Sequence, residues 1–238
     1  MHDNSDQASG AAASPGQESA PRRARRRRPS AAEDTKTALA ECRQAVKVSP
    51  RRAGARFNLA ELYKRYGKLN AALVEYRNAV ELSPENAYYR YKLGDCYTAV
   101  GMMPHAALEL EAARDLEPQD GFYHFCLGEV YARSGRFEEA ITALNQATVY
   151  SPSDMYYNVR LGIVYLHAGL LLEAAATFRQ AIEFDPQNAS YHCLLGDAYV
   201  QLGYERQALQ HYRDAGSLDP YDADYVERIR RLSAAISA

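Results

Sequence analysis

A period of 34 residues runs through most of this 238-residue chain and constrains its fold more than any other feature. It is seen first in the prolines, which recur without a slip as Pro50, Pro84, Pro118, Pro152, Pro186 and Pro220. A fixed period of this length indicates one structural unit stacked on copies of itself, because each copy buries its apolar face against its neighbours.

Other residues keep the same period. Counting each unit from Ala53, Ala87, Gly121, Met155 and Ala189, a residue's "position" is its place within its unit. Leucine recurs at position 7, glycine at 8, tyrosine at 11, glycine at 15, alanine at 20 and 27, and proline at 32; repeat one alone has Ala60 at position 8. So many matches in phase leave almost no room for coincidence.

Each recurring residue has a local role in a helical hairpin. Apolar residues recur at helical spacing in both halves of the unit, and the glycine at position 15 lies between them, where φ > 0 ends the first helix. Position 34 is always Asn or Asp, a good N-cap, and the proline at position 32 ends the preceding helix. Small residues at positions 8, 20 and 27 let two helices approach, and we expect the tyrosine at position 11 to fill the space beside them.

This pattern resembles the tetratricopeptide repeat, a helix-turn-helix unit of 34 residues. The resemblance covers residues 53–222 as five repeats, at 53–86, 87–120, 121–154, 155–188 and 189–222. It implies an all-α, right-handed α-solenoid. Residues 35–52 carry alanines in phase with positions 20 and 27 and are expected to be the second helix of a half repeat. Residues 223–238 are expected to form an amphipathic capping helix.

Residues 1–34 have a different composition, with mostly small and polar residues and no aromatic side chain, and we expect this tail to be disordered. Its basic charge is concentrated in Arg22, Arg23, Arg25, Arg26, Arg27 and Arg28. Such a run can make electrostatic contact with nucleic acid or an anionic surface, or serve as a nuclear address in a eukaryote; the alternative is a solubilising tail. If RNA binds at all, we expect this tail to carry it.

The rest of the sequence indicates the cellular compartment and the kinds of functional site to expect. The four cysteines are scattered without metal-ligand spacing, so we predict free thiols, no metal and no cofactor. A reducing cytoplasm fits best, and no apolar stretch is long enough for a signal peptide or a membrane span. No HExxH, nucleophile motif or phosphate loop occurs, so we predict no enzymatic activity. His124 and His192 both fall at position 4, where packing is the expected role.

In the resembled family, positions 2, 5, 9 and 12 of each repeat commonly face a concave groove. Here this stripe supplies apolar and aromatic candidates for partner binding, namely Phe57, Tyr88, Tyr91, Phe122, Phe125, Tyr156, Val159, Ile163 and Leu166. It also supplies a ladder of carboxylates, Glu61, Asp95, Glu129 and Asp197. We therefore predict a non-catalytic scaffold, adaptor or assembly factor that binds a peptide or helix with apolar and basic residues.

Two alternatives concern this groove. Repeat four has a wholly apolar stripe, which indicates either an interface, including self-association into a homo-oligomer, or thicker packing between repeats. Some tetratricopeptide domains hold the acidic C-terminal tails of chaperones with Lys and Asn. Asn58 and Lys92 occupy two candidate places here, but an aromatic and acidic groove suits a carboxylate poorly, and we predict no such binding. The tyrosines at position 3 are expected to pack between repeats.

Overall fold

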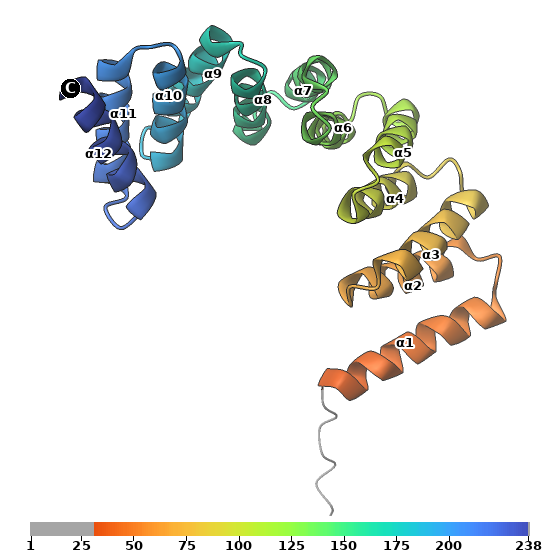
Figure 1. Ribbon diagram of the computed structural model, residues 1–238. Coiled ribbons are helices and arrows are strands. Elements are labelled where there is room, and N and C mark those ends of the chain that lie inside the picture. Colours follow the sequence, from red (N-terminus) through yellow and green to blue (C-terminus); the bar gives the residue numbers. More distant parts are fainter. Residues whose placement is uncertain (1–30, 238) are drawn as a thin grey trace, which may run out of the picture.

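The computed structural model describes residues 31–237, which form twelve helices joined by short turns, without a strand among them (Figure 1). The arginine run of the tail lies outside the described residues. The helices are α1 (Ala31–Val48), α2 (Ala53–Arg65), α3 (Leu69–Leu82), α4 (Ala87–Val100), α5 (Met103–Leu116), α6 (Gly121–Arg133), α7 (Phe137–Tyr150), α8 (Met155–His167), α9 (Leu171–Phe184), α10 (Ala189–Gln201), α11 (Glu205–Leu218) and α12 (Ala223–Ser237).

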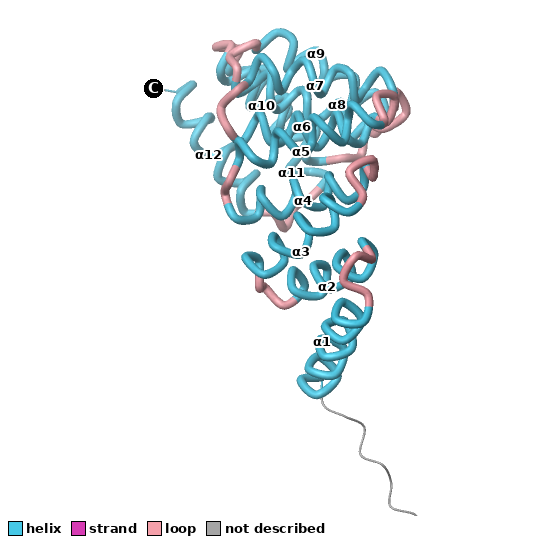
Figure 2. Tube along the Cα trace, turned by 90° about the vertical axis from the view of Figure 1, so that its right-hand side faces the viewer, coloured by secondary structure: helices cyan, strands magenta, loops and turns pink. Residues whose placement is uncertain are grey.

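The helices form an all-α solenoid that curves into an arc (Figure 1). The closest approaches between helix backbones join neighbours in the chain, as expected when each unit packs only on the next. Figure 1 shows α4, α6 and α8 toward the inside of the arc and α5, α7 and α9 toward the outside. Figure 2 shows α1 projecting from one end of the stack. The first helix of each repeat therefore lines the inner side.

The helix pairs of the solenoid begin at Ala53, Ala87, Gly121, Met155 and Ala189, and the single helix α1 precedes them. Helix α1 begins at Ala31, four residues before the predicted half repeat at 35, so residues 31–34 belong to the helix and not to the tail. The closing helix α12 begins at the predicted boundary.

The turns and caps confirm the local part of the prediction. The five glycines at position 15 all have positive φ, between 70° and 87°. The Asn or Asp at position 34 accepts a hydrogen bond from a backbone N–H in the first turn that follows; Asn86 accepts from Tyr89 N at 2.9 Å and Asp120 from Phe122 N at 2.8 Å. Residues within each repeat thus end one helix and begin the next.

The core repeats along the solenoid, and the tyrosines at position 11 contribute to it: Tyr97 and Tyr131 are buried, and Tyr63 and Tyr165 pack against the same cluster. A large side chain at position 24 fills the space opposite the small residue at position 8: a Cβ on Gly94 would lie 2.9 Å from Leu110 Cγ, and one on Gly196 only 2.5 Å from Tyr212 Cε1. Two of the tyrosines at position 11 also bond to the preceding unit through their hydroxyl groups. The Tyr63 hydroxyl accepts from Arg43 at 3.1 Å, and that of Tyr131 donates to Glu111.

Two further predictions can be compared with the described residues. All four cysteines are free thiols, Cys96 and Cys193 buried and Cys42 and Cys126 half-buried. Within residues 31–237, no helix combines the length and the apolar composition needed to cross a membrane.

Candidate protein-binding surface

Aromatic rings from successive repeats pack on one another along the first helices. The ring at position 5 of one repeat stacks on the ring at position 3 of the next, with centroids 4.6 Å apart for both Phe57–Tyr89 and Phe125–Tyr157. Tyr91 lies 6.3 Å from Tyr123 at the intervening junction. The tyrosines at position 3 therefore pack between repeats, as predicted.

The rings at position 2 lie above these stacks and are the more exposed members of the stripe. Tyr88 lies 5.6 Å from Phe57 and 5.9 Å from Tyr91, yet 47% of its surface is exposed. Tyr156 lies 5.5 Å from Phe125 and is 57% exposed. Phe122 joins the two groups, since it contacts Tyr91 edge-on at 4.8 Å and precedes Phe125 by three residues on α6.

We call this set the aromatic surface; its members are Phe57, Tyr88, Tyr91, Phe122, Phe125 and Tyr156. It is carried by α2, α4, α6 and α8, the helices that line the inner side of the arc (Figure 1). Because the rings brace one another, they are held in place before any ligand arrives, which lowers the entropy cost of binding.

A hollow of about 190 Å³ opens in this surface at the junction of repeats two and three. Tyr91 and Phe125 form two of its walls, and Asp95, Cys126 and Glu129 line it as well. Position 6, occupied here by Cys126, carries a long basic side chain in repeats two and four, Lys92 and Arg160. The shorter cysteine leaves room that those side chains would fill.

The carboxylates of the predicted ladder are already paired within the chain. Glu61 binds Lys92 at 3.3 Å, and Glu129 binds Arg160 through Nε at 2.8 Å and Nη2 at 2.5 Å. Asp197 binds Arg228 of α12. Each of these cations stands at position 6 of the following unit and each acid at position 9, so the pairs tie adjacent repeats together.

Asp95 departs from this pattern because Cys126 offers no cation, and Asp95 binds Lys64 of repeat one instead. Each acid of the ladder thus has one basic partner, and two also accept a tyrosine hydroxyl, Glu61 from Tyr76 and Asp197 from Tyr212. The expected surplus of negative charge in the groove is therefore compensated locally. The sequence-based prediction considered only positions 2, 5, 9 and 12. It therefore left out the cations at position 6.

Repeat four places its apolar stripe largely in the packing between repeats. Val159 is only 8% exposed and belongs to a buried cluster with Phe178 and Leu195. Ile163 and Leu166 are half-buried against the same cluster, as is Leu194 of repeat five. At the junction of repeats four and five, positions 9 and 6 are thus Ile163 and Leu194. The same positions carry an ion pair at three other junctions, between repeats one and two, three and four, and five and α12.

Tyr91 and Cys126, which line the hollow, both stay neutral near neutral pH. Burial, assisted by the nearby Asp95 carboxylate, raises the pKa of Tyr91 to about 12. Burial likewise raises the pKa of the Cys126 thiol to about 12, with Asp95 and Glu129 adding to the effect. Both groups remain neutral, so Tyr91 offers a partner an aromatic ring with a hydroxyl and Cys126 is a poor nucleophile.

The side chains at position 4 form a second recurring set, one whose pairing the sequence analysis did not identify. Arg56 and Arg90 donate to the backbone oxygens of Pro50 and Pro84, at 2.9 and 2.8 Å. His124 Nε2 takes the same place against Pro118 O at 2.9 Å and is buried, which confirms its predicted packing role. The sequence signal that could have revealed this set is a hydrogen-bond donor that recurs six residues after each proline.

Comparisons with known proteins agree with this architecture. Models described as tetratricopeptide repeat match residues 125–189 and 189–222, and a model described as TPR repeat matches residues 63–101. No curated protein matches the chain.

Several solved structures share the fold. YrrB, described as a TPR protein with an unusual peptide-binding site, is 24% identical with a TM-score of 0.66, over 80% of this chain and 98% of that one. MamA from Desulfovibrio magneticus RS-1 is 19% identical with a TM-score of 0.66, over 72% and 97%. A thermophilic TPR protein of Thermus thermophilus is 21% identical with a TM-score of 0.54, over 77% and 100%. The repeat frame, the family matches and these shared folds together show that the chain is a member of the tetratricopeptide repeat family.

Proposed function

We propose that the protein is a non-catalytic scaffold that binds an apolar segment of a partner protein, a peptide or one face of a helix, on its aromatic surface. The observation that carries the proposal is the exposure of Tyr88 and Tyr156 above rings that are fixed by packing. Rigid aromatic side chains supply large contact areas with little loss of conformational freedom, which is why they dominate the energetics of protein interfaces.

The hollow between repeats two and three is the proposed seat for one side chain of the partner. It lies between Tyr91 on α4 and Phe125 on α6; Tyr88 is also on α4, and Tyr156 is on the next inner helix, α8. A chain that crosses from repeat two to repeat four would pass over it. An apolar or aromatic anchor seated there would be enclosed by rings on two sides, the setting typical of interface hot spots.

Charge has a secondary role in this proposal. The predicted selection of basic residues by Glu61, Asp95, Glu129 and Asp197 would require each acid to exchange or share its internal cation. Exchanging one cation for another of equal charge leaves the Coulomb energy of these partly buried pairs nearly unchanged, so such exchange adds little affinity. We therefore place specificity in the aromatic surface, with Ile163 and Leu166 at its edge and Val159 excluded because it is buried.

The likeness to YrrB supports the class of function and not its details. That protein is described as having a peptide-binding site, and its chain matches this one along 98% of its length at 24% identity. Repeats of this family bind proteins on surfaces formed by many units, which is the use proposed here. Nothing in the described residues suggests a catalytic constellation, and we propose none.

The test is affinity capture from the source cells with the intact protein and two variants. Tyr88→Ser combined with Tyr156→Ser removes the two exposed rings, and Tyr204→Ser, which alters a tyrosine of similar exposure at the turn before α11, is the matched control. We expect a partner to be retained by the intact protein and the control but lost with the double variant. Equal retention by all three would refute the proposal, provided that melting temperatures show all three folded.

Self-association through repeat four is the second candidate, favoured by the exposure of Leu170 and Leu172 at the turn into α9. Sedimentation equilibrium distinguishes it. A mass that rises with concentration in the intact protein but not in Leu172→Glu would favour the homo-oligomer, and a constant monomer mass would exclude it. The predicted contact of the arginine tail with nucleic acid or anionic surfaces lies outside the described residues and stays a prediction.

A further inference from the structure

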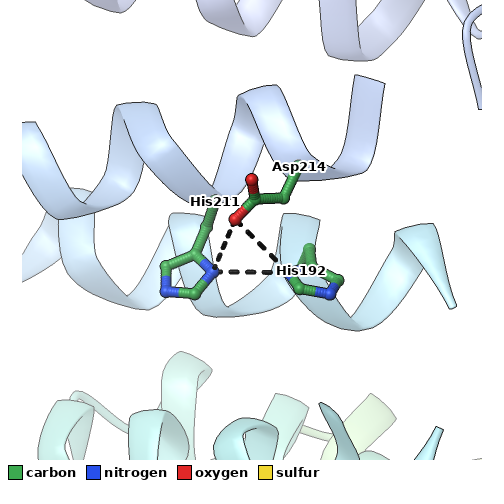
Figure 3. A group of neighbouring side chains, drawn as sticks. All are labelled: His192, His211 and Asp214. Carbon is green, nitrogen blue, oxygen red and sulfur yellow. Dashed lines mark hydrogen bonds and ion pairs between the residues drawn. The ribbon is translucent and has the colours of Figure 1, made fainter. Parts of the chain in front are cut away.

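Repeat five replaces a recurring ion pair with two histidines. In repeats one and two, the arginine at position 4 binds the glutamate at position 23, Arg56–Glu75 at 2.9 Å and Arg90–Glu109 at 3.1 Å. The same two positions in repeat five hold His192 on α10 and His211 on α11, with their Nδ1 atoms 3.4 Å apart. Asp214, one turn beyond His211, completes the group shown in Figure 3.

A hydrogen bond on its outer side orients the His192 ring. Its Nε2 lies 3.2 Å from the backbone oxygen of Pro186, the contact that position 4 makes in other repeats. Because a carbonyl oxygen only accepts, Nε2 carries the proton and the lone pair of the neutral ring lies on Nδ1. Histidines that bind metals commonly donate their second N–H to a backbone carbonyl in this way, which fixes both tautomer and orientation.

Asp214 is oriented by a similar outer contact. Its Oδ1 accepts a hydrogen bond from Gln210 Nε2 at 2.9 Å. Its Oδ2 lies 3.9 Å from Nδ1 of His192 and 3.9 Å from Nδ1 of His211. Figure 3 shows these three atoms facing a common point between α10 and α11. Two of the three groups therefore have their outer atoms occupied and their inner atoms directed at one another.

The spacing matches the requirements of a tetrahedral ion. Bonds of about 2.0–2.1 Å at tetrahedral angles separate neighbouring ligand atoms by roughly 3.3–3.4 Å. The two Nδ1 atoms are already at 3.4 Å, and Oδ2 at 3.9 Å needs to approach by about half an ångström. Two imidazoles and a carboxylate form a donor set suited to Zn²⁺ and related first-row ions rather than to Ca²⁺ or Mg²⁺.

We propose that His192 Nδ1, His211 Nδ1 and Asp214 Oδ2 form a binding site for a divalent transition-metal ion such as Zn²⁺, with a fourth position open to solvent. The side chains are 12%, 25% and 38% exposed, so an ion can reach the site while the ligands stay in place.

A bound ion would link the two helices of the last full repeat. The ligands come from α10 and α11, so binding would stabilise the end of the solenoid as the Arg–Glu pairs do in repeats one and two. Unlike those pairs, the link would depend on the supply of metal. Binding to the folded state alone raises stability in proportion to the logarithm of ligand concentration over Kd.

The experiment is a titration of the metal-free full-length protein, purified without a histidine tag, with Zn²⁺ by calorimetry and with Co²⁺ by absorption spectroscopy. His192→Gln and Asp214→Asn remove ligands from different helices. His124→Gln is the matched control, because His124 also stands at position 4 but faces Ala143 at position 23. Melting temperatures without metal establish that each variant is folded, and if one is not, the other carries the test.

We expect one equivalent of Zn²⁺, a Co²⁺ spectrum typical of tetrahedral geometry, and a Tm that rises with Zn²⁺. Either ligand variant should weaken binding by at least about tenfold, as losing a ligand costs no less than losing an outer-shell contact, while His124→Gln binds normally. The proposal would be overturned if the intact protein bound no Zn²⁺ or if both folded ligand variants bound it as the intact protein does. Either result would leave His192 and His211 as a hydrogen-bonded pair.

Discussion

Repeats two and five occupy equivalent places in the 34-residue frame but present different chemistry. Both have the small residue at position 8 against a large one at position 24, Gly94 with Leu110 and Gly196 with Tyr212. At position 2, however, repeat two has Tyr88 and repeat five has Ser190. At positions 4 and 23, repeat two has an arginine and a glutamate where repeat five has two histidines.

The difference separates two kinds of position. Positions 8, 15, 20, 24, 27 and 34 build the hairpin and its packing, and they vary little because every repeat must meet the same neighbours. Positions 2, 4, 5 and 23 carry different residue types from one repeat to the next. Proposed recognition in repeat two and proposed metal binding in repeat five both use this second kind of position.

The largest expected effect concerns the shared frame. Leu110→Ala in repeat two and Tyr212→Ala in repeat five each open a cavity opposite the glycine of position 8. We expect Leu110→Ala to lower the free energy of unfolding by about 2–5 kcal/mol and Tyr212→Ala by about 3–5 kcal/mol. Urea unfolding measures both, and a loss under about 1 kcal/mol in either repeat would contradict the equivalence of their cores.

The next effect concerns position 2. Tyr88→Ser should weaken partner binding by about tenfold or more, since an exposed aromatic anchor is lost, yet cost less than about 1 kcal/mol of stability. Ser190→Ala at the same position of repeat five should change neither quantity. Affinity for the captured partner and thermal unfolding are the two measurements. Loss of binding with Ser190→Ala but not with Tyr88→Ser would reverse the comparison.

A smaller effect is expected at position 6, where repeat two has Lys92 bound to Glu61 and repeat five has the apolar Leu194. Ile163→Glu alone places a carboxylate against an apolar cluster and should destabilise the protein by about 1–3 kcal/mol. Adding Leu194→Arg supplies the cation that other junctions have and should recover about 0.5–1 kcal/mol or more. A double-mutant cycle in urea measures this coupling; a value of zero would show that the two positions do not meet.

The smallest effect concerns positions 4 and 23. Replacing His192 with Arg and His211 with Glu transfers the Arg90–Glu109 pair of repeat two into repeat five. Because both pairs are partly exposed, we expect the metal-free stability to change by less than about 1 kcal/mol. The increase in Tm on adding Zn²⁺ should disappear. A variant that still responded to Zn²⁺ would place the metal elsewhere in the protein.

The frame could be predicted from the sequence because its signals are local. A glycine such as Gly101 needs only its own turn to adopt positive φ, and an N-cap such as Asn86 needs only the next three residues. The start of α1 was placed four residues late because residues 31–34 carry none of the periodic residues.

The candidate site could be predicted only in part because it depends on contacts between repeats. The aromatic stripe follows from helical spacing, but the burial of Val159 depends on Phe178 and Leu195 in other helices. Glu61 is neutralised by Lys92, which lies 31 residues further along the chain. Predicting this pair would have required comparing position 9 of one repeat with position 6 of the next. The histidine pair similarly becomes visible only after the Arg–Glu pairing in earlier repeats is known.

The most direct measurement for the central claim is photo-crosslinking in the source cells, with a photoreactive phenylalanine placed at Tyr88, Tyr156 or Tyr204 in turn. These side chains have similar exposure, but only the first two belong to the aromatic surface. We predict one and the same crosslinked partner from Tyr88 and Tyr156 and none from Tyr204. A partner crosslinked from Tyr204 alone would contradict the aromatic surface as the binding site.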